Sequence, residues 1–293
     1  MNSEAVAGLA HPPLHEVRAI VRRALDEDVA WGDVTTDYSV PAGQSSRAVL
    51  LAKQPGVFCG GRVFAEVFQM VDPAVAADLA TIDGTPIARG DVVARLHGPT
   101  RALLTGERTA LNFVQRLSGI ATVTAAFVER LRGLPTRLVD TRKTTPGLRV
   151  LEKYAVRVGG GHNHRFNLAD AVLLKDNHLA AFRNRGMELA AAVRSVRERV
   201  PHTMRVEVEV TALGQIEDAL DGGADVILLD NMSNDDMRVA VQQIKGRALT
   251  ECSGNVILET VRERALTGVD LISSGALTHS AKALDLSLEI EID

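Results

Sequence analysis

Basic side chains are concentrated in one stretch in the middle of the chain. Residues 137–175 hold eight lysines and arginines against three acidic residues, although the whole chain has a formal net charge of −4. Arginine guanidinium groups match carboxylate and phosphate oxygens in two-point contacts, so such a cluster predicts a polyanionic ligand. Arg142 and Lys143 lie in the turn DTRKTTPG, and Arg165 comes shortly after three glycines. The remaining arginines of the stretch are expected on a solvated face: Arg137, Arg149 and Arg157.

Two acidic residues, Glu209 and Asp230, stand in successive apolar runs that are predicted to be neighbouring strands. Carboxylates beside a phosphate-binding region usually hold Mg²⁺ or stabilise a cationic transition state. Strand alternation in RVEVEV (205–210) places Glu207 on the same side as Glu209. The sequence therefore predicts carboxylates that serve a metal ion or a developing cation, and structural ion pairs are the alternative.

Two short glycine-containing turns, SGN (253–255) and SSGA (273–276), each follow a predicted strand and precede a helical stretch. Backbone N–H groups at such turns, together with a helix N-terminus, can bind a phosphate group. The last two strands of an α/β barrel are a frequent place for such a site. With the basic stretch, these turns predict a phosphorylated, multiply anionic substrate.

These chemical residues come from a repeated strand–helix pattern that begins near residue 136. Strands are expected at 136–140, 171–175, 205–210, 224–230, 247–252 and 269–275, with helices near 186–199, 212–221, 234–245 and 256–266. Such alternation implies a parallel sheet, and short spacing around one core favours a barrel. Because barrel active sites lie at the C-terminal ends of the strands, the polar residues there are expected to share one rim. They are Asp140, Arg142, Lys143, Lys175, Glu207, Glu209, Asp230, Glu251, Ser253 and Ser273.

The N-terminal part of the chain has a different pattern. Apolar residues at helical spacing predict a surface helix over 14–28, and a second helix is expected over 62–70. Runs at 47–52 and 91–98 are predicted strands, with Gly and Pro between them. Segment 106–132 is predicted to be mostly helical with a break at Gly119. This part is therefore expected to form a separate α+β region.

The composition limits the classes of partner. Aromatic residues make up 3% of the chain and the net charge is small, so neither nucleic acid nor a membrane is expected as a partner. Two distant cysteines, Cys59 and Cys252, predict buried thiols in a reducing cytosol rather than a disulfide framework. No secretory signal and no run of about 18 apolar residues is recognised, so we expect a cytoplasmic protein. Trp31 is expected to pack in the core or at an interface.

Several motifs resemble those of one family, quinolinate phosphoribosyltransferase. They are GDVTTD (32–37), GERTALNFVQRLSGIAT (106–122), DTRKTTPGLRVLEKYAVRVGGGHNHRFNLADAVLLKDNHL (140–179), VEVEV (206–210), ILLDNM (227–232), ECSGNV (251–256) and DLISSGALTHSAKALDLSLEI (270–290). The 40-residue block from Asp140 is the most specific of them. The resemblance implies transfer of phosphoribosyl from phosphoribosyl pyrophosphate to quinolinate with decarboxylation, giving nicotinate mononucleotide, pyrophosphate and CO₂.

The resemblance also implies a fold and an assembly. An N-terminal α/β sandwich domain is expected over 1–116, joined by the C-terminal tail 280–293, and an open, incomplete TIM-like α/β barrel over 117–279. The family works as a homodimer or larger homo-oligomer in which the sandwich of one subunit covers the barrel mouth of another. A shared active site is the consequence.

The resemblance further assigns roles to residues. Arg142, His164, Arg165 and Lys175 would bind the two carboxylates of quinolinate, with Arg108 reaching in from the neighbouring subunit. Lys143, Glu209 and Asp230 would be the catalytic residues that engage ribose, pyrophosphate and Mg²⁺, with Glu209 and Asp230 as the metal-binding carboxylates. The 5′-phosphate would lie at Ser253, Gly254, Ser274 and Gly275.

Other functions remain as alternatives. A paralogous phosphoribosyltransferase of the same fold would share most of these residues. His162 and His164 have the His-x-His spacing of metal ligands, which a metal-dependent barrel hydrolase would use. Lys175 at a strand end is also where a Schiff-base aldolase has its lysine. A non-catalytic anion-binding protein would have no use for carboxylates inside a phosphate site.

Overall fold

The computed structural model describes residues 9–292, which fall into two compact units. The first unit comprises the described part of Met1–Ala125, with Thr144–Gly160 and the C-terminal segment from Leu277. The second comprises Ala126–Lys143 and Gly161–Ala276. The domain ranges given by the sequence, 1–116 and 117–279, stay a prediction. The predicted barrel range includes residues 144–160, which belong to the first unit here.

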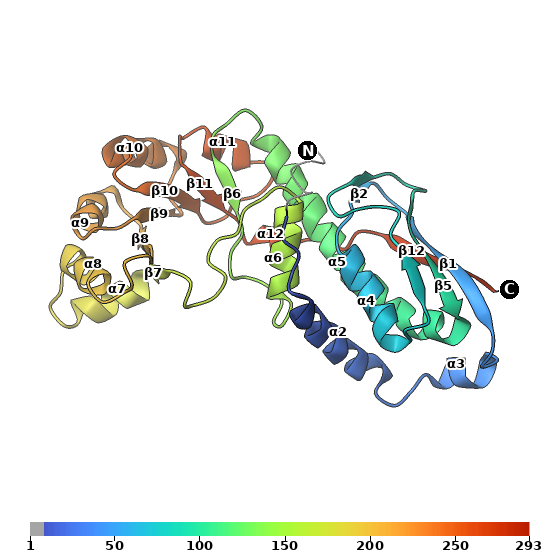
Figure 1. Cartoon of the computed structure of the whole chain (residues 1–293). Helices are drawn as coiled ribbons and strands as arrows, with labels where there is room; N and C mark the ends of the chain where they lie inside the picture. Colours follow the sequence, from blue (N-terminus) through green and yellow to red (C-terminus); the bar gives the residue numbers. More distant parts are fainter. Residues whose placement is uncertain (1–8, 293) are drawn as a thin grey trace. The chain divides into compact units, whose positions relative to one another are not determined.

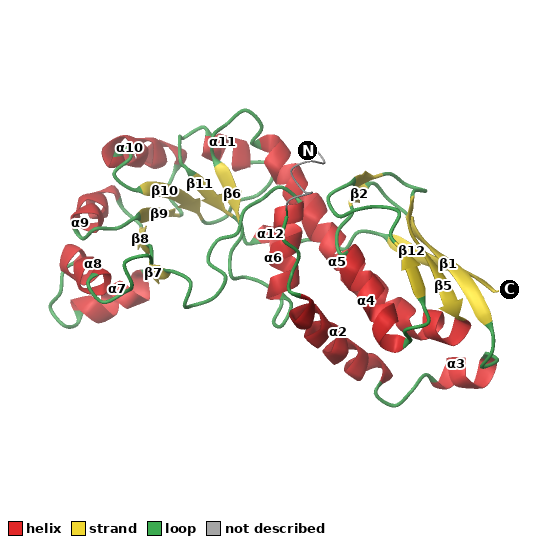
Figure 2. Ribbon diagram, viewed as in Figure 1, coloured by secondary structure: helices red, strands yellow, loops and turns green. Residues whose placement is uncertain are grey.

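The first unit is built on an antiparallel sheet with the order β12-β1-β5-β3 (Figures 1 and 2). Its strands are β1 (Ser45–Ala52), β3 (Ala76–Asp78), β5 (Val92–Pro99) and β12 (Leu286–Ile292), and a two-stranded ribbon pairs β2 (Gly56–Val57) with β4 (Pro86–Ile87). Burial alternates along most of β1, which shows that one face of the strand packs on the core. The C-terminal strand β12 therefore completes the sheet of the N-terminal region.

The helices of this unit are α2 (Leu14–Val29), α3 (Val34–Ser39), α4 (Gly61–Val71), most of α5 (Thr100–Arg130), α6 (Arg149–Val158) and most of α12 (Ala276–His279). The predicted helices over 14–28 and 62–70 are confirmed as α2 and α4, because their apolar spacing buries one stripe of side chains. Helices α3 and α6 lacked so clear a pattern and were not predicted. Helix α6 buries seven of its ten residues, including Glu152 and Lys153.

Helix α5 runs without interruption from Thr100 to Arg130, so the predicted break at Gly119 is wrong. A side chain at Gly119 would place its Cβ 2.0 Å from the carbonyl oxygen of Lys282. The glycine therefore allows the C-terminal segment to pack closely on the helix, and it does not change the direction of the helix. By length and composition α5 could cross a membrane, but 56% of its most apolar window is buried, as in core helices of soluble proteins.

The second unit contains six parallel strands in the order β6-β11-β10-β9-β8-β7 (Figure 1). They are β6 (Arg137–Val139), β7 (Val172–Leu174), β8 (Val206–Val210), β9 (Val226–Asp230), β10 (Leu249–Ser253) and β11 (Leu271–Ser273). Each lies inside a predicted run or within one residue of it. Strands β6 and β7 form the two edges and do not pair with each other, so the barrel is open, as expected.

Helices connect the strands of this unit: α7 (Asp176–Arg183), α8 (Leu189–Arg197), the 3₁₀ turn η1 (Leu213–Gln215) with α9 (Ile216–Asp221), α10 (Asn234–Ile244) and α11 (Val261–Ala265). Strands β8 and β9 are buried along nearly their whole length, as parallel strands covered on both faces should be. Their apolar residues therefore form the core. Glu209 and Asp230 lie toward the C-terminal ends, whereas Glu207 is buried within β8. Cys59 and Cys252 are buried free thiols, whereas Trp31 is 99% exposed and is not a core residue.

Candidate active site

A cavity of about 530 Å³ lies at the C-terminal ends of the strands in the second unit. Its wall consists of Thr141, Arg142, Lys143, His164, Arg165, Leu173, Lys175, Leu228, Asp230, Asn231, Glu251, Ser253, Gly254, Asn255 and Ser273. These residues lie on or just beyond β6, β7, β9, β10 and β11, apart from His164 and Arg165, which come from the loop between α6 and β7. The cavity therefore lies where a parallel α/β barrel usually has its active site.

One side of the cavity is cationic. Arg142 and Arg165 are close enough that the positive charge of Arg142, together with burial, lowers the pKa of the Arg165 guanidinium. The Nε of Arg142 is buried and has no hydrogen-bond acceptor within residues 9–292. Since a buried donor without a partner is costly, this wall is arranged for an anionic ligand that would supply the acceptor.

His164 is held in one orientation by three hydrogen bonds. Its backbone N–H donates to Oδ1 of the buried Asp140 at 2.8 Å, and its Nδ1 accepts the backbone N–H of Arg165 at 2.7 Å. Its Nε2 lies 3.0 Å from Oε2 of Glu207. With Nδ1 accepting this hydrogen bond, the Nε2 proton of His164 is directed at Glu207.

Two buried carboxylates, Glu207 of β8 and Glu251 of β10, face this imidazole. Oε2 of Glu251 lies 3.6 Å from His164 Nε2, and the two glutamates are 5% and 1% exposed. Burial and the nearby Glu207 charge raise the pKa of Glu251 to about 7, while His164, Ser273 and Lys175 act in the opposite direction. At neutral pH this carboxyl group is consequently divided between its acid and its anion.

The ligand atoms of His164, Glu207 and Glu251 lie within 4.8 Å of one another, a grouping that could in principle hold a metal ion. The imidazole argues against this use. If Nδ1 accepts a hydrogen bond from Arg165 and Nε2 also gave its lone pair to a metal, the ring would carry no proton at all. The cluster is therefore better described as a hydrogen-bonded acid group than as a metal centre.

The predicted catalytic carboxylates occupy adjacent strands. Glu209 of β8 accepts a hydrogen bond from Lys175 Nζ at 3.2 Å, and Asp230 at the end of β9 accepts one from Asn231 Nδ2 at 2.8 Å. Asp230 lines the cavity, whereas Glu209 is not in its wall but is hydrogen-bonded to Lys175, which is. Oxygen donors of this kind suit Mg²⁺, which binds few protein carboxylates and keeps several other oxygen ligands.

The turn after β10 brings backbone close to the cavity. Gly254 has φ +90°, and a Cβ there would lie 2.1 Å from Oδ1 of Asn231. Asn231 and Asn255 also have positive φ, 53° and 49°, which asparagine tolerates better than most residues. Ser253, Gly254 and Asn255 thus form a tight turn open to the cavity. The chemistry of this turn fits a phosphate group.

Four predicted site residues are not part of the cavity wall: Glu209, which is bonded to Lys175 as described above, and Ser274, Gly275 and Arg108. Ser274 is buried, and its hydroxyl donates to the carbonyl oxygen of Val256 at 3.1 Å, so its side chain is used in the fold; Gly275 follows it. Arg108 belongs to the first unit, where it lines a separate hollow of about 310 Å³. The remaining predicted residues are brought together. Asn231 and Thr141 also line the cavity, but the sequence had given them no role. Glu251 lines it too, and the sequence had placed it at the rim without a chemical role.

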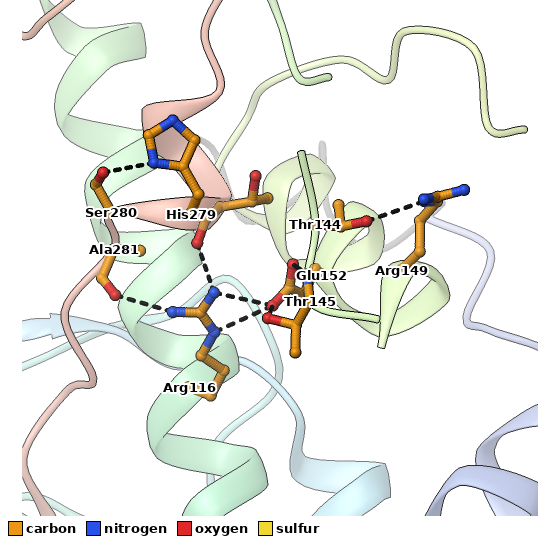
Figure 3. Close-up of polar contacts among 9 residues, drawn as sticks. Arg116, Thr144, Thr145, Arg149, Glu152, His279, Ser280 and Ala281 are labelled. Atoms are coloured by element: carbon orange, nitrogen blue, oxygen red, sulfur yellow. Dashed lines mark hydrogen bonds and ion pairs between the residues drawn. The ribbon is translucent and has the colours of Figure 1, made fainter. Parts of the chain in front are cut away.

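The turn that carries Arg142 and Lys143 continues into the first unit, where it is firmly anchored (Figure 3). Glu152 of α6 is fully buried and accepts hydrogen bonds from Thr145 Oγ1 at 2.7 Å and Thr145 N at 3.1 Å. Arg116 of α5 donates to the same carboxylate at 2.9 Å and to the carbonyl oxygen of Ala281 at 2.9 Å. Three separate segments of this unit are thereby joined at one ion pair, whose carboxylate is fully buried and whose Arg116 is partly exposed.

An open parallel barrel with cations, a phosphate-type turn and paired carboxylates at its strand ends defines an enzyme that acts on phosphorylated and carboxylated substrates. Comparisons with known proteins give the family. Residues 33–118 match the model of the quinolinate phosphoribosyl transferase N-terminal domain, and residues 120–289 match that of the C-terminal domain. The chain therefore belongs to the quinolinate phosphoribosyltransferase family.

Named relatives and solved structures agree over nearly the full length. A probable nicotinate-nucleotide pyrophosphorylase [carboxylating] of Bacillus subtilis is 42% identical over 277 residues, 94% of each chain. A quinolinate phosphoribosyltransferase [decarboxylating] of Nicotiana tabacum is 39% identical and covers 97% of this chain and 85% of its own. The crystal structure of NadC from Streptococcus pyogenes has a TM-score of 0.92 and 43% identity, covering 97% of this chain and 99% of its own.

Proposed function

We propose that the cavity of the second unit is the place where this enzyme converts quinolinate. The chain is a quinolinate phosphoribosyltransferase: it joins quinolinate to phosphoribosyl pyrophosphate and forms nicotinate mononucleotide, pyrophosphate and CO₂, a step of NAD biosynthesis. The observation that carries this conclusion is the cationic wall with its buried, unpartnered Arg142 Nε among residues 9–292, in a chain that matches both domain models of the family.

Quinolinate would bind with its two carboxylates against the cationic wall. Arg142, Arg165 and Lys175 are the proposed partners, because guanidinium groups bind carboxylates through two parallel hydrogen bonds. His164 has both ring nitrogens engaged within the protein, so its proposed part is to fix the wall at Arg165. The pyridine nitrogen then faces the anomeric carbon of the sugar.

The chemistry at the sugar would proceed by loss of pyrophosphate. Positive charge develops on the ribose, and Glu209 and Asp230 can stabilise it. Lys143 would take up charge on the departing pyrophosphate, and the turn of Ser253 and Gly254 would hold the 5′-phosphate. Attack by the pyridine nitrogen makes a cationic pyridinium ring, which stabilises the electron pair left on the ring carbon when the adjacent carboxylate departs as CO₂. A proton taken up from water at this carbon then completes nicotinate mononucleotide.

Mg²⁺ is the proposed metal. Glu209 and Asp230 lie on adjacent strands and offer carboxylate oxygens next to the proposed pyrophosphate position, which supports a hard divalent cation there. When bound, the ion would neutralise charge on the leaving pyrophosphate. The two side chains would hold and orient it, while Lys175 and Asn231 keep these carboxylates in place through their hydrogen bonds.

The direct test follows CO₂ release on incubation with quinolinate, phosphoribosyl pyrophosphate and Mg²⁺, with nicotinate as the alternative substrate. Arg142→Ala and Arg165→Ala should each lower kcat/KM for quinolinate by about a hundredfold, since a charge-assisted two-point contact is worth roughly 2–3 kcal/mol. Arg137→Ala, an exposed residue of the same region, is the matched control and should leave turnover unchanged. Near-normal turnover of both cavity variants would refute the assignment.

A homodimer with a shared active site is also proposed, with Arg108 of the partner subunit as the contributed residue. Support comes from the surface around the hollow that Arg108 lines in the first unit. Val34 lines this hollow and is 69% exposed, and Trp31 and Tyr38, close to it in the sequence, are 99% and 89% exposed. Large apolar side chains exposed together are typical of surfaces that bind another protein.

A cytoplasmic location is proposed as well. Both cysteines are free thiols, as expected in a reducing compartment. The single helix that has the length and composition of a membrane span among residues 9–292 is α5, and it is largely buried within the fold. Fractionation of the native cells, with the activity followed in the soluble and membrane fractions, tests this proposal.

A further inference from the structure

The two buried glutamates beside His164 raise the question of how many negative charges this part of the cavity holds. Glu207 and Glu251 come from β8 and β10, and both direct a carboxylate oxygen at the same imidazole nitrogen. Each also has a second oxygen, Oε1, that is buried and accepts no hydrogen bond within the described part of the chain. Two ionised carboxylates in such a place would leave buried charge without compensation.

The imidazole supplies one proton to this group, not two. Nδ1 of His164 accepts the Arg165 backbone N–H, so Nε2 is the only ring nitrogen that directs a proton at the two glutamates. That proton is directed at Glu207, the closer acceptor at 3.0 Å, and Arg165 is a positive neighbour of the same carboxylate. Glu251, at 3.6 Å, is therefore the carboxyl group with the least compensation for a negative charge.

Glu251 also lines the cavity in which the diacid is proposed to bind. We propose that Glu251 is a positioning residue that holds a proton whenever quinolinate is bound, so that binding of the diacid is coupled to uptake of this proton. As an acid, Glu251 adds no negative charge to an anion site and offers an O–H donor. As an anion, it would repel both carboxylates of the ligand. The inference rests on the proposed quinolinate site.

The surroundings of Glu251 fix the direction of the effect. The groups that act on Glu251 are Glu207 of β8, His164 of the loop before β7, Lys175 at the end of β7 and the Ser273 hydroxyl of β11. The other charged residues of the same cavity wall are Arg142, Lys143, Arg165 and Asp230. His164, Ser273 and Lys175 favour the anion, whereas burial and Glu207 favour the acid. The negative charges of bound quinolinate would also favour the acid, so binding of the dianion brings a proton onto Glu251.

The test is calorimetry of quinolinate binding to the full-length protein at pH 8, in two buffers with different ionisation enthalpies. Quinolinate is a dianion throughout this range, so proton uptake reports on the protein. The wild type should take up most of one proton, and its affinity should fall by about tenfold between pH 7.5 and 8.5. Glu251→Gln, which mimics the acid, should take up none and should bind with an affinity that no longer varies with pH.

Glu259→Gln is the matched control, because Glu259 is exposed in the same unit and has no part in the cavity. It should behave as the wild type. Binding without proton uptake in the wild type, or equal uptake in Glu251→Gln, would overturn this inference and leave the proposed function intact. Absence of any quinolinate binding by the wild type would overturn both.

A second measurement covers the case in which Glu251→Gln does not fold. Infrared difference spectra of the wild type at pH 8, with and without quinolinate, should show a new protonated-carboxyl band on binding that shifts in D₂O. Spectra without such a band would overturn the inference independently of any variant. A merely structural hydrogen bond at Glu251 would produce neither the band nor the proton uptake.

Discussion

Gly254 shows how a single backbone position can control the cavity. Its φ is +90°, and a Cβ at this position would lie 2.1 Å from Asn231 Oδ1, so there is no room for a side chain. Asn231 in turn donates to Asp230, a proposed catalytic carboxylate. Gly254→Ala should therefore displace Asn231 and lower kcat/KM by at least about tenfold, with stability reduced by about 1 kcal/mol through the strained φ.

Gly268→Ala is the control for this prediction, because it introduces backbone strain at a position outside the cavity wall. Gly268 has φ +92°, but the nearest atom to its Cβ is Val241 Cγ1 at 3.5 Å, and it lies outside the cavity wall. This variant should lose similar stability in urea unfolding while it keeps its kinetic constants. Equal kinetic constants for both variants would show that the turn after β10 does not hold substrate.

The raised pKa of Glu251 predicts how stability depends on pH. A carboxyl group with a folded pKa of about 7 and an ordinary unfolded value near 4.5 binds more protons in the folded state. Its stabilising contribution is fully present below about pH 4.5 and is lost as the pH rises through 7. Relative to Glu251→Gln, the wild type should lose about 2–3 kcal/mol between pH 5 and pH 8. Urea unfolding at both values measures this loss, and parallel curves for the two proteins would contradict it.

At the scale of elements, α5 depends on Gly119 for the approach of the C-terminal segment. Gly119→Ala would force its Cβ against the Lys282 carbonyl, and backbone cannot move aside as a side chain can. We expect a loss on the order of 3 kcal/mol in the free energy of unfolding. Gly43→Ala, which meets nothing within 4 Å, is the control and should be neutral. If Gly119→Ala were as stable as Gly43→Ala, the close approach would not exist in solution.

The ion pair of Arg116 and Glu152 joins α5, α6 and the segment around Ala281 within the first unit (Figure 3). Arg116→Met keeps the length of the side chain but leaves a fully buried carboxylate without its cation. Breaking one half of such a pair costs about 3–5 kcal/mol. Arg116→Met combined with Glu152→Gln should recover part of this loss, as chemical denaturation can measure. If the double variant were no more stable than Arg116→Met, the unpaired charge of Glu152 would not be the cause of the lost stability.

The sequence predicted the strands of the second unit because each apolar run ends in a polar residue, and parallel pairing then places these ends at one rim. Lys175, Asp230 and Ser253 were found in this way. The environment of His164 could not be predicted, since its partners Asp140, Glu207 and Glu251 come from three strands distant in sequence. Likewise, Gly119 was taken for a break because the segment that packs against it begins some 160 residues later.

At the scale of the whole molecule, the cavity and Arg108 belong to different compact units. The proposed assembly takes Arg108 from the partner subunit, so the sites of a dimer would each need residues from both chains. A variant of Arg108 would then lack the residue that one subunit contributes to its partner's site. A variant of Lys143 would lack a residue of the cavity itself. Their combination distinguishes a shared site from two independent ones.

Arg108→Ala and Lys143→Ala, co-expressed with different tags, should regain about a quarter of the wild-type activity. Half of the dimers are then mixed, and each mixed dimer has one intact site and one with both changes. Lys143→Ala co-expressed with Arg142→Ala is the control, because both residues lie in the same cavity and no mixed dimer has an intact site. Activity of the unfractionated mixture measures the outcome, and doubly purified dimers, which are all mixed, should have about half of the wild-type activity. No recovery in the first pair would contradict the shared site, and recovery in the control pair would contradict the placement of Arg142 and Lys143 in one site of one subunit.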